Sequence, residues 1–144
     1  MIREIQMQDL ESLLELYTHL HEKSVPEDSA HRREVWARIL NEPDYHIIVA
    51  EEDGRIVSSC VCVIVPNLTH ELRPYALIEN VVTHADWRKR GLATACLDFA
   101  REIARAQDCY KIMLMTGSKE ESTLRFYERA GYSRGDKTAF NQWL

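Results

Sequence analysis

Three cations that stand before a glycine are the first stretch of this sequence with residue types that could support chemistry. Arg88, Lys89 and Arg90 directly precede Gly91, and apolar residues recur at helical spacing from Leu92 onward. A helix N-terminus presents backbone N–H groups without intrahelical partners and carries partial positive charge. Glycine lets a ligand approach the backbone closely. The stretch therefore favours a phosphate site, while a basic turn at a solvated helix start would explain it equally well.

A carboxylate just upstream is the second candidate for chemistry. Residues 76–82 are rich in β-branched side chains and predict a buried strand, which Glu79 and Asn80 interrupt. Burial would raise the pKa of a glutamate toward the range in which it accepts a proton at neutral pH. Glu79 is therefore a candidate general base or water-positioning group. The alternatives are a group that binds the substrate, or a structural carboxylate that pairs with a buried arginine or accepts hydrogen bonds where strands separate.

Other kinds of site find little support in the sequence. The basic stretch matches neither G-x-x-x-x-G-K-[ST] nor G-x-G-x-x-G, so nucleotide hydrolysis and dinucleotide binding are disfavoured. No Cys-x-x-Cys or His-Glu-x-x-His pattern predicts a metal. Cys60 and Cys62 could carry an acyl group, but no histidine partner is apparent for them. We expect all four cysteines to be small buried thiols in a reducing cytoplasm.

Length and composition fit one soluble domain. The chain has 144 residues, of which 45% are hydrophobic and 28% charged, so we expect a single domain over residues 1–144. The net charge of −5 argues against general nucleic-acid binding and is compatible with a cationic amine substrate. No apolar run approaches the roughly 20 residues of a membrane helix, and the N-terminus has no signal-peptide pattern. We therefore expect a cytoplasmic protein without a membrane partner.

The elements that must position these residues alternate along the chain. Because a strand, a helix and a strand follow one another from residue 75, we expect a right-handed crossover with parallel pairing of residues 75–83 and 111–116. The full prediction is a strand at 1–5, helices at about 10–20 and 30–40, strands at 46–51, 56–65 and 75–83, a helix from 92, a strand at 111–116, a helix to about 130 and one or two strands after 132.

Two motifs in this order resemble a known family. Residues 88–93, Arg-Lys-Arg-Gly-Leu-Ala, resemble [Q/R]-x-x-G-x-[G/A], the acetyl-CoA signature of the GNAT superfamily of N-acetyltransferases. Residues 123–132 resemble the A-x-x-[FL]-Y-x-x-x-G-[FY] of the same family, and the order of elements is also similar. The Ile-Glu-Asn-Val-Val around Glu79 resembles the segment that carries the active-site glutamate in members that acetylate glucosamine 6-phosphate. The likeness covers residues 45–132 well and the first forty only in outline.

The resemblance implies a fold and a cofactor. The expected fold is α/β, with a mixed, mostly antiparallel twisted sheet of six to seven strands, about four helices, and a parallel splayed pair at the cofactor site. The expected cofactor is acetyl-CoA, whose pantetheine arm would meet backbone groups of residues 81–83 as an added strand. The cofactor-binding residues that the resemblance implies are Val81, Val82, Thr83, Arg88, Lys89, Arg90, Gly91, Leu92, Ala93 and Thr94.

The resemblance also implies a reaction. Tyr127 would protonate the departing thiolate, since a phenol keeps its proton at neutral pH; a core aromatic is the alternative. One position departs from the family, because Glu120 stands where many relatives have an asparagine that contacts the cofactor, and no role is assigned to it. We expect direct acetyl transfer in a ternary complex to the primary amine of a small molecule. Amino sugars, amino acids and polyamines are all open as acceptors, and protein amines are not excluded.

Two further expectations concern assembly and the alternative class of protein. Many relatives are homodimers, and the apolar residues within 138–144 suggest a dimer that uses C-terminal strands. The alternative to an enzyme is a non-catalytic acyl-CoA-binding or regulatory module of the same fold. The presence of Glu79 and Tyr127 beside an intact basic turn favours the enzyme.

Overall fold

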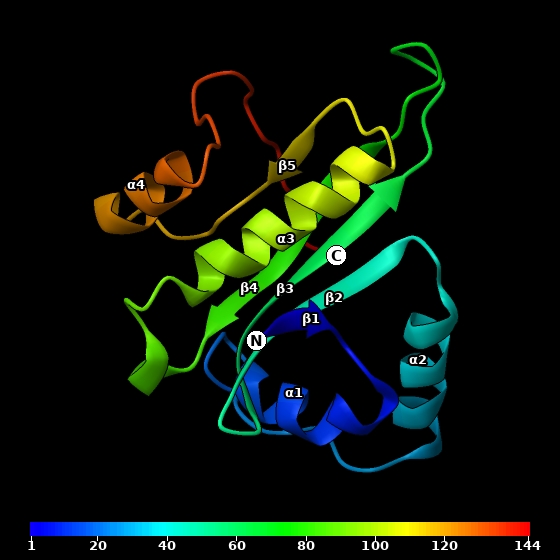
Figure 1. Ribbon diagram of the computed structural model, residues 1–144, viewed down its shortest axis with the longest axis vertical. Helices are drawn as coiled ribbons and strands as arrows, with labels where there is room; N and C mark the ends of the chain where they lie inside the picture. The colour runs from blue at the N-terminus through cyan, green and yellow to red at the C-terminus, as the bar shows by residue number, and fades with distance from the viewer.

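A five-stranded mixed sheet with four α-helices forms the protein, and the computed structural model describes all residues 1–144 (Figure 1). The predicted α/β class and mostly antiparallel sheet are confirmed, because β1 to β4 pair antiparallel and only β4 and β5 pair parallel. No helix has the length and apolar character needed to cross a membrane.

In sheet order the strands are β1 (Ile2–Glu4), β2 (Tyr45–Glu52), β3 (Arg55–Val65), β4 (Tyr75–Thr83) and β5 (Ile112–Leu114). The helices are α1 (Leu10–Tyr17), α2 (Ala30–Asn41), α3 (Leu92–Ala106) and α4 (Glu121–Arg129), with short 3₁₀ helices η1 (Met7–Asp9) and η2 (Ala85–Trp87).

Helix α3 packs on one face of the sheet through small side chains. Figure 1 shows it running along β3 and β4. Its inner stripe contains Cys96, Ala100 and Ala104, which are almost completely buried and recur at intervals of four residues. Because these side chains are small, the helix axis can approach the buried Cys60 and Cys62 of β3 closely. This packing fixes the N-terminus of α3 relative to the end of β4.

Helices α1 and α2 build a second apolar cluster on the opposite face. Leu13 and Leu16 of α1 pack with Trp36 of α2 against residues of β2, β3 and β4. The indole Nε1 of Trp36 donates a hydrogen bond to the carbonyl of Met7 at 3.2 Å, so its one polar atom is satisfied. The sheet is therefore covered on both faces, and the C-terminal end of α1 is held near the end of β4.

Strand β4 separates from β5 after a short stretch of pairing. The parallel ladder joins Ala76–Ile78 to Ile112–Leu114 and then stops. At this point the β3–β4 register shifts, since Val61 faces Glu79 but Ser59 faces Val82. Strand β4 thus has one residue more than β3 here, and Asn80 takes a left-handed φ of 51°. Such a bulge bends its strand, and the predicted splayed parallel pair is confirmed.

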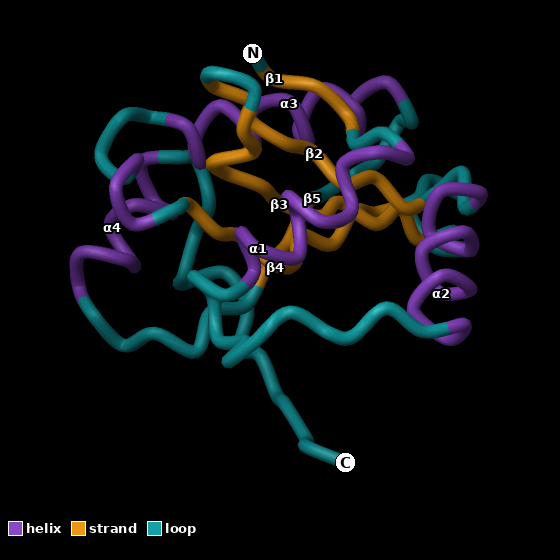
Figure 2. The backbone as a smooth tube through the Cα atoms, turned by 90° about the horizontal axis from the view of Figure 1, so that it is seen from below, coloured by secondary structure: helices purple, strands orange, loops and turns teal.

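The prediction of six to seven strands is wrong at the C-terminus. Residues 132–144 form no strand, and no backbone–backbone hydrogen bond involves residues 133–144. A strand forms only beside a neighbour, and this segment has a single β-branched residue, Thr138, and no neighbour within its own chain. Figure 2 shows it leaving the body of the molecule as an extended arm.

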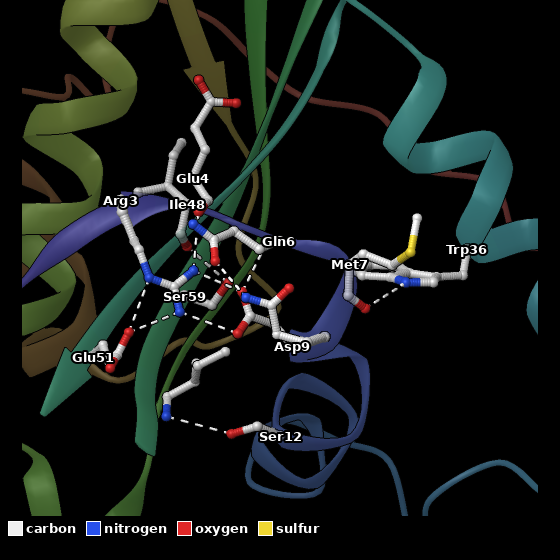
Figure 3. Close-up of polar contacts among 12 residues, drawn as sticks. Arg3, Glu4, Gln6, Met7, Asp9, Ser12, Trp36, Ile48, Glu51 and Ser59 are labelled. Carbon is white, nitrogen blue, oxygen red and sulfur yellow. Dashed lines mark hydrogen bonds and ion pairs between the residues drawn. The ribbon is translucent and has the colours of Figure 1, made fainter. Parts of the chain in front are cut away.

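An ion-pair network fastens the N-terminus to the sheet (Figure 3). The guanidinium of Arg3 donates to both carboxylate oxygens of Asp9, at 2.6 and 3.1 Å, and to Oε2 of Glu51 at 2.8 Å. Asp9 also accepts from the backbone N–H of Gln6 at 2.7 Å. The hydrogen bond from Arg3 holds the pKa of Asp9 below its usual range, although burial acts against it. The network connects β1, β2 and the start of α1, and so fixes where α1 lies.

We predict that Asp9→Asn lowers the free energy of unfolding by about 2 kcal/mol at neutral pH, because it removes a charge-assisted hydrogen bond of a largely buried pair. The folded-state pKa of Asp9 is lowered, so its contribution is present above the unfolded pKa of about 3.9 and is lost as pH falls through the folded value. Urea unfolding at neutral and acidic pH measures both effects.

The control is Glu52→Gln, which removes an exposed ion pair with the N-terminus. It should change stability by less than about 0.5 kcal/mol. Equal effects of the two variants, or an Asp9→Asn loss that does not shrink in acid, would contradict the assignment.

Candidate active site

The site begins where the sheet opens. Beyond Ile78, strand β4 has no partner on its β5 side, so Glu79–Thr83 present a free edge. Pairing with β3 continues as far as Thr83, which holds this edge in place beyond the bulge. A free edge beside a second diverging strand can accept an extended chain by backbone hydrogen bonding. The opening leads directly to the N-terminus of α3.

The N-terminus of α3 has unsatisfied backbone donors. Gly91 is its N-cap with a φ of 77°, and no side chain caps the helix. The first helical hydrogen bond runs from Ala95 N–H to the Gly91 carbonyl at 2.9 Å, so the N–H groups of Leu92, Ala93 and Thr94 have no protein partner. No heavy atom lies within 4 Å of where a Cβ on Gly91 would stand. Open space and three free donors make this an anion site.

The three predicted cations lie at this helix start. Arg88 donates through Nε to the Thr83 carbonyl at 3.3 Å, and Arg90 donates to the Asp86 carbonyl at 3.2 Å. The guanidinium of Arg90 also stacks 4.6 Å from the centre of the Trp87 ring. None of the three cations forms an ion pair, so their charge is not compensated within the chain. Uncompensated positive charge beside free backbone donors suits an anionic ligand.

The predicted pantetheine-binding residues lie on the free edge. Val81 packs against the core beneath α3, whereas Val82 is buried on the opposite face. The hydroxyl of Ser58 donates to the Val82 carbonyl at 2.9 Å and lies 2.8 Å from the hydroxyl of Thr83. These hydrogen bonds fix the backbone of the edge. Its contact with a cofactor stays a prediction.

Glu79 lies at the opening, but the premise of its burial is wrong. The residue is exposed, because β5 has already diverged and nothing covers β4 on that side. An apolar run does not reveal where a neighbouring strand ends. Glu79 lies near Tyr45, whose pKa is raised by burial first and then by the charge of Glu79. The β3 partner of Glu79 is Val61 of the cluster that α1 and α2 build, so the exposed carboxylate lies on that face of the sheet, beyond the area that the helices cover.

Tyr127 lies on the face of the sheet that α3 covers. Helix α4 carries it against the core beneath α3, where its ring meets Phe126 and Tyr132 edge to face at 4.9 and 6.3 Å. Gly131, with a φ of 100°, ends the helix, and Tyr132 N–H donates to the Tyr127 carbonyl at 3.0 Å. This is a C-terminal glycine cap, and the helix ends at the place that the sequence predicts. Burial raises the pKa of Tyr127, so its phenol keeps a proton at neutral pH.

The cysteines are poor acyl carriers. Burial raises the pKa of Cys60, and it raises the pKa of Cys62 to about 12 and of Cys96 to about 11. A thiol must ionise to act as a nucleophile, and these do not at neutral pH. This agrees with the sequence-based expectation of inert buried thiols for these three cysteines, whereas Cys109 is only partly buried.

Two tyrosines near the opening escaped the sequence analysis. Tyr17, the last residue of α1, lies near Asn80 and Ser59, and burial raises its pKa. Tyr45, the first residue of β2, lies beside Glu79. Each tyrosine is far from residues 78–94 in sequence and belongs to no motif. Only the fold brings them together, since α1 packs against β4 and β3 joins β2 to β4 in the sheet.

Comparisons with known proteins agree with this geometry. A profile described as the Acetyltransferase (GNAT) family matches residues 10–132. A glucosamine 6-phosphate N-acetyltransferase from Trypanosoma brucei brucei is 33% identical over 137 residues, which cover 91% of this chain and 87% of that protein. The chain therefore belongs to the GNAT family and is an N-acetyltransferase, as the sequence predicts. Acetyltransferases of this family use acetyl-CoA.

Solved structures support the same conclusion. A protein from Agrobacterium tumefaciens str. C58, itself described only as a candidate acetyltransferase, has a TM-score of 0.91 at 40% identity and covers 100% of this chain and 99% of its own. Glucosamine-6-phosphate N-acetyltransferase from Arabidopsis thaliana has a TM-score of 0.88 at 21% identity, covering 99% of this chain and 97% of its own. At that identity the second comparison shows the shared fold alone.

We predict that Gly91→Glu weakens acetyl-CoA binding far more than Gly91→Gln. Both side chains bear the same strain of a left-handed backbone, but only the glutamate places a negative charge at the N-terminus of α3. A charge at a helix end is worth up to about 2 kcal/mol, so the glutamate variant should bind roughly tenfold or more weakly than the glutamine variant. Calorimetry measures both affinities, and circular dichroism confirms folding. Equal affinities would remove the anion site from this helix start.

Proposed function

We propose that this protein transfers the acetyl group of acetyl-CoA directly to the primary amine of a small molecule within a ternary complex. The observation that carries the proposal is the free edge of β4, which leads from Glu79 to the unpartnered N–H groups of Leu92–Thr94. Acetyl-CoA supplies the activated acyl thioester. Residues 81–83 would hold its pantetheine arm, and residues 88–94 would hold its pyrophosphate.

The proton balance assigns a role to Glu79. A substrate amine with a pKa near 10, like that of lysine, is mostly protonated at neutral pH and must lose a proton before it can attack. Glu79 stands exposed at the opening, where it can accept that proton directly or through a water molecule. Because the Glu79 carboxylate is exposed, a water molecule can remain beside it when the amine is bound and can pass the proton to it.

Tyr127 supplies the matching acid. When the thioester carbon–sulfur bond breaks, the coenzyme leaves as a thiolate that needs a proton. The phenol of Tyr127 lies on the α3 side of the opening, whereas Glu79 lies on the other side. The proposed base and the proposed acid can thus act from opposite faces of the opening between β4 and β5. Because the buried cysteines are protonated, direct transfer needs no covalent acyl-enzyme.

The acceptor to test first is an amino sugar phosphate. The relative from Trypanosoma brucei brucei, which aligns over 91% of this chain, is a glucosamine 6-phosphate N-acetyltransferase. Glucosamine 6-phosphate should therefore lead a panel that also contains free amino sugars, amino acids and polyamines. Release of free coenzyme A reports turnover. Acetyl-CoA binding without turnover across the panel would favour a non-catalytic module of the same fold.

The proposal includes a single catalytic domain over residues 1–144 in the cytoplasm. All four cysteines are free thiols, which suits a reducing compartment. No nucleic acid or membrane is proposed as a partner, because the formal net charge is −5.

A homodimer is also part of the proposal. The extended arm exposes Phe140 to 90% and Trp143 to 92%, which leaves two large apolar side chains in water in a single copy. The outer edge of β5 has no strand beside it, and Met113 and Met115 next to it are partly exposed. Pairing of the arm's backbone with β5 of a second copy would give the β5 edge a neighbouring strand and would cover the exposed apolar side chains.

We predict a dimeric mass by light scattering for the whole chain and a monomeric mass when residues 136–144 are deleted. The control is Lys137→Ala, which keeps the arm and should remain dimeric. A monomeric whole chain at micromolar concentration, or a truncated chain that stays dimeric, would contradict the arm's role. Far-ultraviolet circular dichroism verifies that the truncated chain is folded.

We predict that Tyr127→Phe lowers kcat about 10²-fold and leaves acetyl-CoA affinity nearly unchanged, within the usual range for loss of a general acid. The ring and its contacts with Phe126 and Tyr132 remain, so only the phenol proton is lost. The matched control is Tyr132→Phe, which removes a second buried phenol from the same aromatic group. Similar losses in the two variants would show that Tyr127 acts through packing and is not the acid.

We predict that Glu79→Gln lowers kcat/KM most at neutral pH and that the loss shrinks as pH rises toward the amine pKa. The base is needed only while the amine carries a proton, so the sign of the pH dependence follows from the proton count. Glu71→Gln, in the β3–β4 loop, is the control carboxylate and should behave like the unaltered protein. A defect of Glu79→Gln that is constant across pH would leave this residue a positioning group.

A further inference from the structure

Two histidines meet beside the start of the basic turn. His19 follows α1 and His84 follows β4, and their ring centres lie 4.1 Å apart at an angle of 40°. Neither residue belongs to a motif, and the contact joins segments 65 residues apart in sequence. His84 is tied to the sheet by its own N–H, which donates to the Val57 carbonyl at 2.8 Å. The pair therefore connects the end of α1 to the end of β4.

Each imidazole accepts a hydrogen bond from the backbone of η2. The N–H of Ala85 donates to Nδ1 of His19 at 3.4 Å, and the N–H of Asp86 donates to Nδ1 of His84 at 3.2 Å. A backbone N–H can only donate, so both Nδ1 atoms must lack a proton. This arrangement requires two neutral rings that carry their proton on Nε2.

The two hydrogen bonds hold the helix that carries the cations. The carbonyl of Asp86 accepts from Arg90, whose guanidinium stacks on Trp87. The carbonyl of Ala85 accepts from the backbone N–H of Arg88 at 3.5 Å. The N–H groups of Ala85 and Asp86 thus face the histidines, while the carbonyls of the same residues face the arginines. Loss of the histidine contacts would free the η2 segment on which the basic turn is built.

Protons can reach the pair through a small cavity. It has a volume of about 180 Å³, and both rings line it together with Glu15 of α1 and Arg55 of β3. The carboxylate of Asp86 lies 3.9 Å from Nδ1 of His84 but is largely exposed. The charged groups around the rings are therefore the acidic Glu15 and Asp86 and the basic Arg55, together with the cations of the basic turn. Two charged rings at this separation would also repel each other.

We propose that His19 and His84 are a proton-sensitive positioning pair for the cofactor-binding turn. While both rings are neutral, they hold η2 and the basic turn in the form that binds the cofactor. A proton on either Nδ1 replaces an acceptor with a donor that faces another donor, and the contact is lost. Coenzyme A affinity then falls as pH decreases through the range of about 8 to 5 in which imidazoles titrate. This inference rests on the proposed acetyl-CoA function.

Asparagine variants can keep the hydrogen bond with η2 while removing the group that takes up a proton. The Oδ1 atom of asparagine can replace Nδ1 as an acceptor and does not titrate. Calorimetry with coenzyme A from about pH 8 to pH 5.5, the range of the imidazole, compares the unaltered protein with His19→Asn/His84→Asn and His19→Ala/His84→Ala. The coenzyme's phosphates also titrate in this range, and the comparison at each pH cancels that contribution.

We expect the alanine pair to bind weakly at every pH and the asparagine pair to recover much of the affinity. Between the highest and lowest pH, the unaltered protein should lose about tenfold more affinity than the asparagine pair, in line with the loss of one or two hydrogen bonds. Parallel curves for these two proteins would overturn the proposal.

A second measurement needs no cofactor. Long-range ¹H–¹⁵N spectra of the free protein at high pH should show both rings with Nδ1 unprotonated. Amide exchange at Ala85 and Asp86 should accelerate in acid more in the unaltered protein than in the asparagine pair. A proton on Nδ1 of either ring, or equal exchange, would overturn the pairing. If coenzyme A binds at no pH, the proposed function fails while these spectra still decide the histidine pair.

Discussion

The extra residue that β4 carries at Asn80 is the constraint on which the site depends. It bends the strand away from β5, ends the parallel ladder at Ile78, and leaves an edge that an extended molecule can join. The left-handed φ of 51° at Asn80 is tolerable for an asparagine. The opening is therefore built into β4 itself and does not require the cofactor to force the strands apart.

The positive charge at the site contrasts with the negative net charge of the whole chain. The formal net charge is −5, yet the turn before α3 concentrates three cations without ion pairs. Stacking of Arg90 on Trp87 and the bond from Arg88 to the Thr83 carbonyl hold two of these side chains before any anion arrives. Because less side-chain freedom is lost on binding, a preorganised cluster favours phosphate more than flexible cations would.

Local chemistry explains what the sequence could predict. Gly91 and Gly131 occupy positions that demand positive φ, so the start of α3 and the end of α4 could be located from residue types alone. The exposure of Glu79 could not be predicted from residue types, since it depends on where β5 ends. The arm after residue 132 looked like a strand because apolar residues do not show whether a neighbour exists in the same chain. The contact of His19 with His84 required the packing of α1 against β4, which no spacing encodes.

The titratable groups around the opening imply a defined pH window for the proposed reaction. In acid, the amine is protonated and the proposed histidine pair loses its contacts with η2. In alkali, the limit is set by the acid that must still hold its proton. Burial raises the pKa of Tyr127, which moves that limit upward and away from neutrality. The aromatic packing of α4 thus widens the window on the alkaline side, while the substrate amine and the histidine pair set the acidic side.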